Sequence, residues 1–421
     1  MGPRRPTRSL RLCILLLVLV VLAVGLVAFT STAQRTSAHF GIFHEAGFGG
    51  ITEAYARLVE ESLEFSYDLF VAEGFAIFPG LIRVDILETD AGELGAEYLE
   101  MDDQGNWIPV IEIAVQSIME DYLLYAYVDL SLEDLVASTC AHELFHVIQD
   151  YHALHGIGDI SEQAFVEPHA TAIQESVFPS ANDYLEPALD FLLAPDSMAF
   201  FQRSYDAGIF WVYMLDRFDL HFLLDLMTAS AAYDGRYAVD HALAEQGLSF
   251  FDVWTEFAVS LATGTLPDAG VLATLVPVAE GSGWWTTTRD PATIPALTVR
   301  ETWTGSPIDI STVNAIHDAE YVPFFEDDAV GTKLRVAHAY GIDILEIIVG
   351  NTAPFTITFQ GDAETQFRTL AVSETDSRWS ASLFAQSLTI RPEPGTTRVR
   401  IVITRSEPGT GEYAITLRPE V

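Results

Sequence analysis

The chain has 421 residues, of which 60 are Asp or Glu and 21 are Lys or Arg, so its formal net charge at pH 7 is −39. Such a composition argues against nucleic-acid binding, because the sequence offers no basic patch to neutralise phosphates. Only Cys13 and Cys140 occur, and Cys13 lies in an apolar N-terminal run, so the rest of the chain is expected to hold no intramolecular disulfide.

The first predicted element is an export signal. Residues 1–11 contain four Arg and no acid, and the apolar run CILLLVLVVLAVGLVAF follows them. Because the positive charge stays on the cytoplasmic side, the chain beyond it is expected to be extracytoplasmic. Ser31-Thr32-Ala33 offers a small-residue cleavage site, although the apolar run is long for a cleaved signal. We expect residues 1–34 to be a signal peptide or an uncleaved membrane anchor, so that the protein is secreted or membrane-held.

Residues 40–130 are predicted to combine one helix with several strands. The helix covers 52–73, strands are expected at 81–89 and 108–115, and DQGN supplies a turn between strand-like runs. The later strand, IPVIEIAV, is a candidate for an edge strand that lies beside the next helix and pairs with an extended substrate. A core strand without substrate contact fits its sequence equally well.

The most informative motif lies in the next helix, which is expected from about 132 to 153. Its centre reads TCAHELFHVI, in which His142 and His146 are one turn apart and project from the same face. Two neutral imidazoles at this spacing can hold one Zn²⁺, with Glu143 beside the open coordination position. A zinc ion held in this way activates water and polarises a carbonyl. The motif therefore predicts zinc-dependent hydrolysis with Glu143 as the general base.

The context of this motif indicates a buried helix. Ser131 and Asp134 form a capping-box pattern, and no charge other than Glu143 occurs between residues 139 and 148. Cys140 points away from the two histidines and is predicted to be core rather than a ligand. The alternative is an amphipathic helix whose histidines are solvated or satisfied within the core.

The third zinc ligand has two main candidates. His152 completes the outline of the metzincin pattern HExxHxxGxxH, but Gln149 replaces the helix-breaking Gly, so His152 is expected at the surface or the helix end. Glu167 lies on a second predicted helix, where a carboxylate completes a site of two His and one Glu. Glu167 is the predicted ligand, and His169 and Glu175 are the fallback ligands.

Two segments resemble gluzincin patterns. FVEPHATA around Glu167 is similar to W-x-x-E-G-x-A, with Phe165 near the aromatic position and a departure at Pro168. SYDAGIFWVYML is similar to the segment Y-x-x-G-x-x-x-x-x-Y-L of aminopeptidase-type gluzincins, in which the first Tyr supports the oxyanion. The resemblance implies that role for Tyr205. A tyrosine at the head of a core helix is the alternative.

Residues 40–265 as a whole resemble a family of bacterial extracytoplasmic metalloproteases of the gluzincin type. The shared segments include HFGIFHEAG, HELFHVIQ, VEPHATAIQESVFPSANDYL and DHALAEQGLSFFDVWTEFAVSLATG. The resemblance implies an α+β zincin-like catalytic domain at 35–265, in which an N-terminal helix and sheet precede a helical subdomain. It does not identify a substrate.

The remaining chain is predicted to be a separate β domain. Residues 266–300 are rich in Thr, Pro and Gly and are typical of a linker. Beyond them the hydrophobic period is two, in runs such as KLRVAHA, FTITFQ and RVRIVITR. These runs predict an all-β antiparallel sandwich at 301–421, which resembles the jelly-roll appendages of secreted bacterial peptidases.

Together, these features predict an exported zinc metallopeptidase that acts on protein or peptide substrates. No GxMEN exopeptidase motif is present, which favours an endopeptidase. The main alternative is a cell-surface binding or adhesion protein whose zinc helix is structural or vestigial. The intact HExxH motif argues against it, because a vestigial site usually loses the Glu or a His. A zinc hydrolase of non-peptide amides or esters is a second enzymatic alternative.

Overall fold

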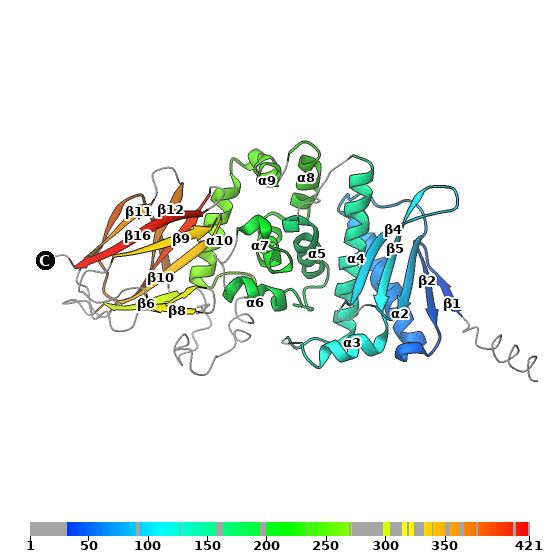
Figure 1. Cartoon of the computed structure of the whole chain (residues 1–421). Helices are drawn as coiled ribbons and strands as arrows, with labels where there is room; N and C mark the ends of the chain where they lie inside the picture. Colours follow the sequence, from blue (N-terminus) through cyan, green and yellow to red (C-terminus); the bar gives the residue numbers. More distant parts are fainter. Residues whose placement is uncertain are drawn as a thin grey trace, which may run out of the picture.

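The computed structural model describes most of the chain up to residue 268 and a series of strands in its C-terminal part (Figure 1). The described residues are 32–89, 93–126, 128–156, 163–193, 199–233, 235–268, 271, 298–303, 314–317, 320–323, 332–338, 340–349, 354–361, 366–375, 378–406 and 410–419. Most of the predicted export segment and most of the predicted linker lie outside these residues. In the described part, no helix combines the length and apolar character needed to cross a membrane.

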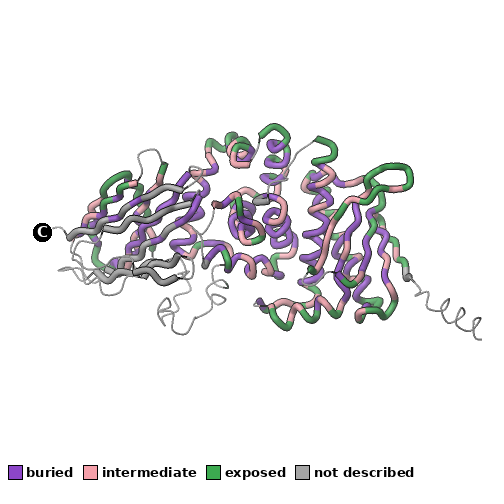
Figure 2. The backbone as a smooth tube through the Cα atoms, viewed as in Figure 1, coloured by how far each residue is buried: buried purple, intermediate pink, exposed green. Residues whose placement is uncertain are grey.

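The chain first forms a five-stranded mixed sheet with the order β1-β2-β3-β5-β4. Its strands are β1 (Thr32–Thr36), β2 (Phe40–Glu45), β3 (Ile82–Leu87), β4 (Gly95–Met101) and β5 (Trp107–Ala114). The inner strands β2, β3 and β5 are parallel to one another, whereas β1 and β4 are antiparallel to their neighbours. The inner strands are largely buried, as their Val and Ile residues favour (Figure 2).

The strand at this edge of the sheet is not the one that one of the two interpretations of the sequence placed there. Residues 108–115 belong to the interior strand β5, and β4 takes the edge instead. The predicted turn is confirmed, because the backbone N–H of Gly105 donates to the carbonyl of Asp102 (3.0 Å) between the two strands. The difference has a compositional reason. β5 carries a nearly continuous apolar run that suits an interior strand, whereas β4 reads GAEYLEM and tolerates solvent at its free edge.

Two long helices pack against the sheet (Figure 1). They are α2 (Glu53–Ala72) and α4 (Leu132–Leu154). Their bounds confirm the helices predicted at 52–73 and 132–153. The hydroxyl of Ser131 caps α4 by accepting from the backbone N–H of Asp134. Because α4 lies between the sheet and the following helices, most of its side chains are buried (Figure 2).

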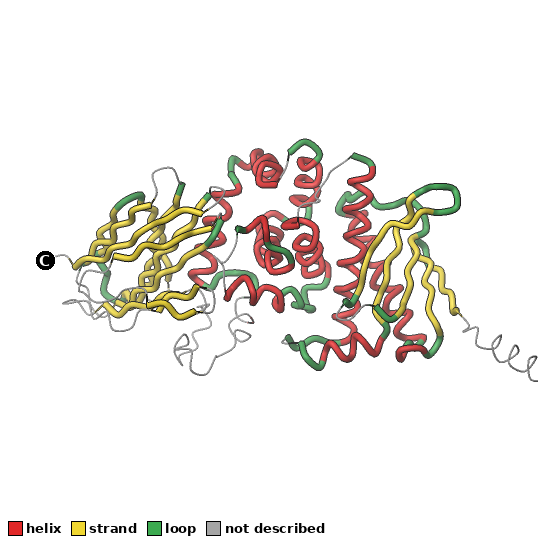
Figure 3. Tube along the Cα trace, in the orientation of Figure 1, coloured by secondary structure: helices red, strands yellow, loops and turns green. Residues whose placement is uncertain are grey.

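Beyond α4, the described chain is mostly helical as far as residue 264, as predicted (Figure 3). The helices are α5 (Gln163–Val177), α6 (Leu185–Leu193), α7 (Gly208–Phe218), α8 (His221–Ser230), α9 (Gly235–Leu243) and α10 (Phe250–Thr263), and α3 (Gln116–Leu123) precedes α4. α5 packs against both α4 and α7. Gly208 permits the close approach of α7, because a Cβ there would lie 2.8 Å from Cγ2 of Thr171 on α5.

The C-terminal strands form a two-sheet sandwich (Figure 3). One sheet has the order β13-β12-β15-β10-β6, the other has the order β14-β11-β16-β9, and β7 pairs with β8. The strands are β6 (Thr298–Trp303), β7 (Asn314–His317), β8 (Glu320–Pro323), β9 (Thr332–His338), β10 (Ile342–Val349), β11 (Phe355–Gly361), β12 (Phe367–Thr375), β13 (Arg378–Phe384), β14 (Ser387–Ile390), β15 (Thr396–Arg405) and β16 (Thr410–Pro419). Buried residues of both sheets, including Ile357 and Ile401, share one core. The pairing departs from the prediction at one place, because β6 runs parallel to β10.

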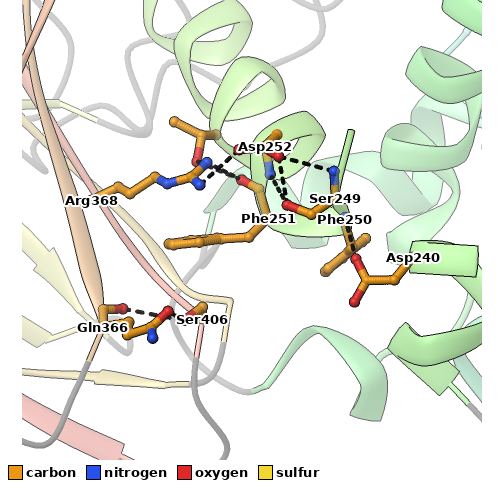
Figure 4. A network of polar contacts seen from close by, with 9 residues as sticks. Asp240, Ser249, Phe250, Phe251, Asp252, Gln366, Arg368 and Ser406 are labelled. Atoms are coloured by element: carbon orange, nitrogen blue, oxygen red, sulfur yellow. Dashed lines mark hydrogen bonds and ion pairs between the residues drawn. The ribbon is translucent and has the colours of Figure 1, made fainter. Parts of the chain in front are cut away.

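The sandwich packs directly on α10. Arg368 of β12 donates to the backbone carbonyl of Phe251 (3.0 Å) and forms an ion pair with Asp252 (2.7 Å; Figure 4). Val372 and Val402 of the sandwich belong to the same hydrophobic cluster as the helices. The chain is therefore an α+β fold followed by β-sheets, and a continuous core joins the two parts.

Candidate metal centre

Helices α4 and α5 bring together the three predicted metal ligands. Oε2 of Glu167 on α5 lies 3.2 Å from Nε2 of His142 and 3.4 Å from Nε2 of His146, both on α4. One donor atom from each of the three residues lies within 4.8 Å of the other two. Two imidazoles and a carboxylate that converge on one point suit a divalent transition metal such as zinc. The group could therefore hold a metal ion.

Each histidine is held through its other ring nitrogen. Nδ1 of His142 lies 2.8 Å from Oε1 of Gln174, and Nδ1 of His146 lies 2.6 Å from Oε1 of Gln149. The orientation of each amide follows from its second contact, because Nε2 of Gln149 donates to the Val166 carbonyl (3.0 Å) and Nε2 of Gln174 donates to a carboxylate. Both amide oxygens must then accept from Nδ1–H, so each imidazole, when neutral, would present the lone pair of Nε2 to a metal.

The carboxylate behind Gln174 belongs to Asp183. Its Oδ1 accepts from Gln174 (2.5 Å), and its Oδ2 accepts from the hydroxyl of Ser138 (2.6 Å). Burial raises the pKa of Asp183, and these two donors work in the opposite direction. Hydrogen bonds thus run from His142 through Gln174 and Asp183 to Ser138, which lies on the same helix as His142.

Glu143 lies beside the ligand group and faces the start of β4. Its side chain is 6% exposed, and burial raises its pKa despite the opposing effect of the two histidines. A Cβ on Gly95 would lie 2.6 Å from Oε1 of Glu143, so only glycine leaves room for this carboxylate in its present position.

Tyr205 precedes α7 and lies against the ligand group. Its ring is stacked on that of His142, with centroids 6.0 Å apart and planes 12° from parallel. Its hydroxyl donates to Glu167. Burial and this carboxylate both raise the pKa of Tyr205. Burial acts to raise the pKa of Glu167, but donation by the histidines and Tyr205 lowers it well below its usual range.

The other candidate ligands, His152 and the fallback residues His169 and Glu175, lie outside this group. His152 sits in the last turn of α4 but is only 1% exposed, so its predicted position at the helix end is confirmed and a surface position is wrong. His169 is buried between the rings of Phe165 and Trp211, and burial lowers its pKa to about 3.

Glu175 faces away from the metal group. Its Oε2 accepts from the backbone N–H of Asn182 (3.1 Å). Pro168, where the sequence departs from the gluzincin pattern, lies inside α5, and the helix continues past it. Cys140 is buried and free, as predicted. Of the candidates named from sequence, only His142, His146 and Glu167 form a group that could hold a metal ion within the described residues.

A cleft runs across the metal group beside β4. It consists of two hollows of about 440 Å³ each, and Gly95, His142, Glu143 and Tyr205 line both of them. The hollow on the side of His146 is also lined by Glu93, Glu97 and Asp150, and the other hollow is also lined by Glu93 and Asp183. Burial and the charge of Asp150 raise the pKa of Glu97 to about 8. The described walls of the cleft carry acidic side chains and neither Lys nor Arg.

Several residues of the site were not singled out as functional by sequence. Gln149 drew notice only as a helix former, although its position three residues after His146 could have indicated a contact. Gln174 and Asp183 are 32 and 41 residues beyond His142, and no local pattern connects them. Gly95 could be identified only from the tertiary structure, because its role depends on the approach of β4 to α4.

No protein-family model and no curated protein matches the chain. A mitogen from Yersinia pseudotuberculosis is a weak structural match, with a TM-score of 0.19 and 7% identity over 22% of this chain and 86% of the mitogen. PliG, a periplasmic inhibitor of g-type lysozyme from Salmonella Typhimurium, has a TM-score of 0.18 and 10% identity over 24% of this chain and 95% of PliG. A 4-O-methyl-α-glucuronidase has a TM-score of 0.16 and 10% identity over 73% and 42% of the two chains. These scores are too low to support an argument about fold or function.

Proposed function

We propose that this protein is an exported, zinc-dependent metallopeptidase with a zincin-like catalytic domain of the gluzincin type. The observation that carries the proposal is the convergence of His142, His146 and Glu167 from two helices, with Glu143 beside them. Two His and one Glu are the ligand set of catalytic zinc sites that keep a fourth position for water. Structural zinc sites typically have four protein ligands, so this set favours catalysis over a structural role.

The chain's own residues can supply the remaining chemistry. A zinc ion bound here would activate water and polarise the substrate carbonyl. Glu143, with its raised pKa, would accept a proton during attack and return it to the leaving amine. The hydroxyl of Tyr205 would donate to the developing oxyanion. Gln149 and Gln174 would keep both imidazoles in the tautomer that presents Nε2 to the metal.

The edge strand β4 supports a peptide as the substrate. It forms one wall of the cleft, and its outer edge pairs with no other strand of the described sheet. An extended peptide could pair with this edge and pass the metal group at Gly95. Acidic side chains line both hollows, which favours substrates with basic residues beside the cleaved bond.

Replacing Glu143 with Gln tests this proposal. The change keeps the shape of the side chain but removes its basicity, so we expect kcat on casein to fall at least about 100-fold. Zinc content of the purified protein should remain one ion per chain. Glu133→Gln, at an exposed position on the same helix, should change neither property.

Four outcomes would contradict the proposal or one of its parts. Full activity of Glu143→Gln would show that Glu143 is not the general base. Loss of zinc in that variant would assign Glu143 to metal binding instead. A wild-type protein that holds zinc but cleaves neither casein nor a small ester would favour a binding or adhesion protein. Cleavage of the ester alone would favour a hydrolase of non-peptide substrates.

A further inference from the structure

The two helices that carry the metal ligands are joined by glutamine side chains. Gln149 accepts from Nδ1 of His146 (2.6 Å) and donates to the carbonyl of Val166 (3.0 Å), which immediately precedes Glu167. One side chain therefore contacts a ligand on α4 and the backbone beside a ligand on α5. We propose that Gln149 is a positioning residue that fixes His146 and Glu167 relative to each other for metal binding.

The burial and position of Gln149 on α4 fix the orientation of its amide. Gln149 is 6% exposed, so its amide has little contact with bulk water. It lies on the same side of α4 as the cleft, which it lines together with His146 and Glu167. A buried amide with both ends satisfied has one favourable orientation, and that orientation determines which imidazole nitrogen faces the metal.

The other histidine is linked to α5 in a different way. His142 contacts Gln174, which is itself a residue of α5. Both imidazoles are thus tied to the helix that provides Glu167, one through a side chain of α5 and one through its backbone. Within the described residues, Gln149 is the side chain that bonds both His146 and the segment next to Glu167.

A carboxylate at this position would act differently from the amide. Glutamate can accept from Nδ1 of His146 but, when ionised, it cannot donate to the Val166 carbonyl. Leucine has a similar size and can do neither. Gln149→Glu therefore keeps the bond to His146 and loses the bond to α5, whereas Gln149→Leu loses both. Comparing the two variants distinguishes the effect of orienting His146 from the effect of the connection to α5.

The inference rests on the proposed zinc site, and the test measures zinc affinity by chelator competition on the purified exported protein. We expect Gln149→Leu to weaken zinc binding by about 10- to 100-fold, as the loss of other contacts to metal-bound histidines does. Gln149→Glu should recover only part of this loss, because the bond to α5 stays broken. Gln104→Leu, at an exposed turn, is the matched control and should bind zinc like the wild type.

The outcomes separate the inference from the proposed function. A wild-type protein that binds no zinc would overturn the proposed site itself. Tight wild-type binding that Gln149→Leu leaves unchanged would overturn only the role of Gln149. Full recovery by Gln149→Glu would show that Gln149 acts on His146 alone and would overturn the connection to α5. A variant that fails to fold is recognised by its far-ultraviolet circular dichroism, and Gln149→Glu then carries the comparison.

Discussion

At the scale of single residues, Tyr205 illustrates how a metal would change the site. Its hydroxyl donates to Glu167, one of the three proposed metal ligands. If a metal were bound to that carboxylate, the hydroxyl could donate instead to an oxygen in the cleft, which Tyr205 also lines. The ring would stay in place because it is stacked on His142.

We therefore predict that Tyr205→Phe lowers kcat by about 100-fold, the usual cost of losing one oxyanion donor. Zinc affinity should change little, since the hydroxyl is not a ligand. Steady-state kinetics with chelator competition would measure both. Tyr98→Phe is a matched control, because that hydroxyl also belongs to a cleft tyrosine but donates to Glu112 (3.1 Å). An unchanged kcat in Tyr205→Phe would show that the hydroxyl of this tyrosine does not stabilise the oxyanion.

Glu175 gives a prediction about stability and pH. Burial first, and then the charges of Asp268 and Asp183, raise the pKa of Glu175 to about 8. The pKa of this carboxyl is higher in the folded protein than in the unfolded chain. The folded state therefore loses stability as the pH rises from about 4.5 to 8 and the carboxyl ionises. Glutamine at this position cannot ionise, and its oxygen can still accept from the N–H of Asn182.

We expect Glu175→Gln to raise the free energy of unfolding by about 1–3 kcal/mol near pH 9 and by much less at pH 5. Urea unfolding of both proteins at the two pH values would measure the difference. A gain of equal size at pH 5 and pH 9 would show that ionisation of Glu175 is not the cause.

At the scale of elements, the approach of β4 to α4 shapes the cleft beside Glu143. The first residue of β4 is Gly95, and the missing Cβ is what leaves space for the carboxylate of Glu143. The contact involves the end of a flexible side chain rather than backbone, so a larger residue would displace Glu143 without disrupting the sheet.

The corresponding prediction is that Gly95→Ala lowers kcat by about 10- to 100-fold while the protein folds and binds zinc normally, because a catalytic group displaced by about 1 Å loses this much. Activity, zinc content and the urea midpoint would be measured together. Ala96→Ser, at the next position of the same strand, is the control. Wild-type activity in Gly95→Ala would place the working position of Glu143 elsewhere.

At the scale of the whole molecule, the β-sandwich shares structure with the helical part. Arg400 of β15 is 1% exposed, its guanidinium donates to the carbonyl of Ala262 on α10, and it lies 4.8 Å from the ring centroid of Trp379. The hydrophobic cluster of the helices continues into the three interior strands of the five-stranded sheet that contains β15, through Val372, Val402 and Ile344. The sandwich predicted as a separate domain is therefore expected to unfold together with the helices.

We predict that Arg400→Leu lowers the free energy of unfolding by about 2–4 kcal/mol, because it leaves a buried carbonyl without its charged donor. The purified protein should show one cooperative urea transition in both tryptophan fluorescence and circular dichroism. Arg391→Leu, at an exposed position of the sandwich, is the control. Two separate transitions in the wild type would show that the two parts unfold independently.

The sequence by itself determined the local features of this protein. One helical turn separates His142 from His146 whatever the fold, because the α-helix fixes that geometry. Alternating and 3.6-residue periods likewise predicted α4, the helical middle part and the strands of the sandwich, since these periods follow from backbone geometry. The choice of Glu167 over His152 also followed from a local property, the helix-forming Gln149 in place of a glycine.

Only the tertiary structure decided which distant residues meet. It placed β4 rather than β5 at the sheet edge, and it set Gly95 against Glu143, because strand order depends on pairing across the whole sheet. It also connected Gln149 to the backbone of α5, a contact that needs two helices packed side by side. Side-chain hydrogen bonds between elements depend on three-dimensional distance, and no period in the sequence encodes that distance.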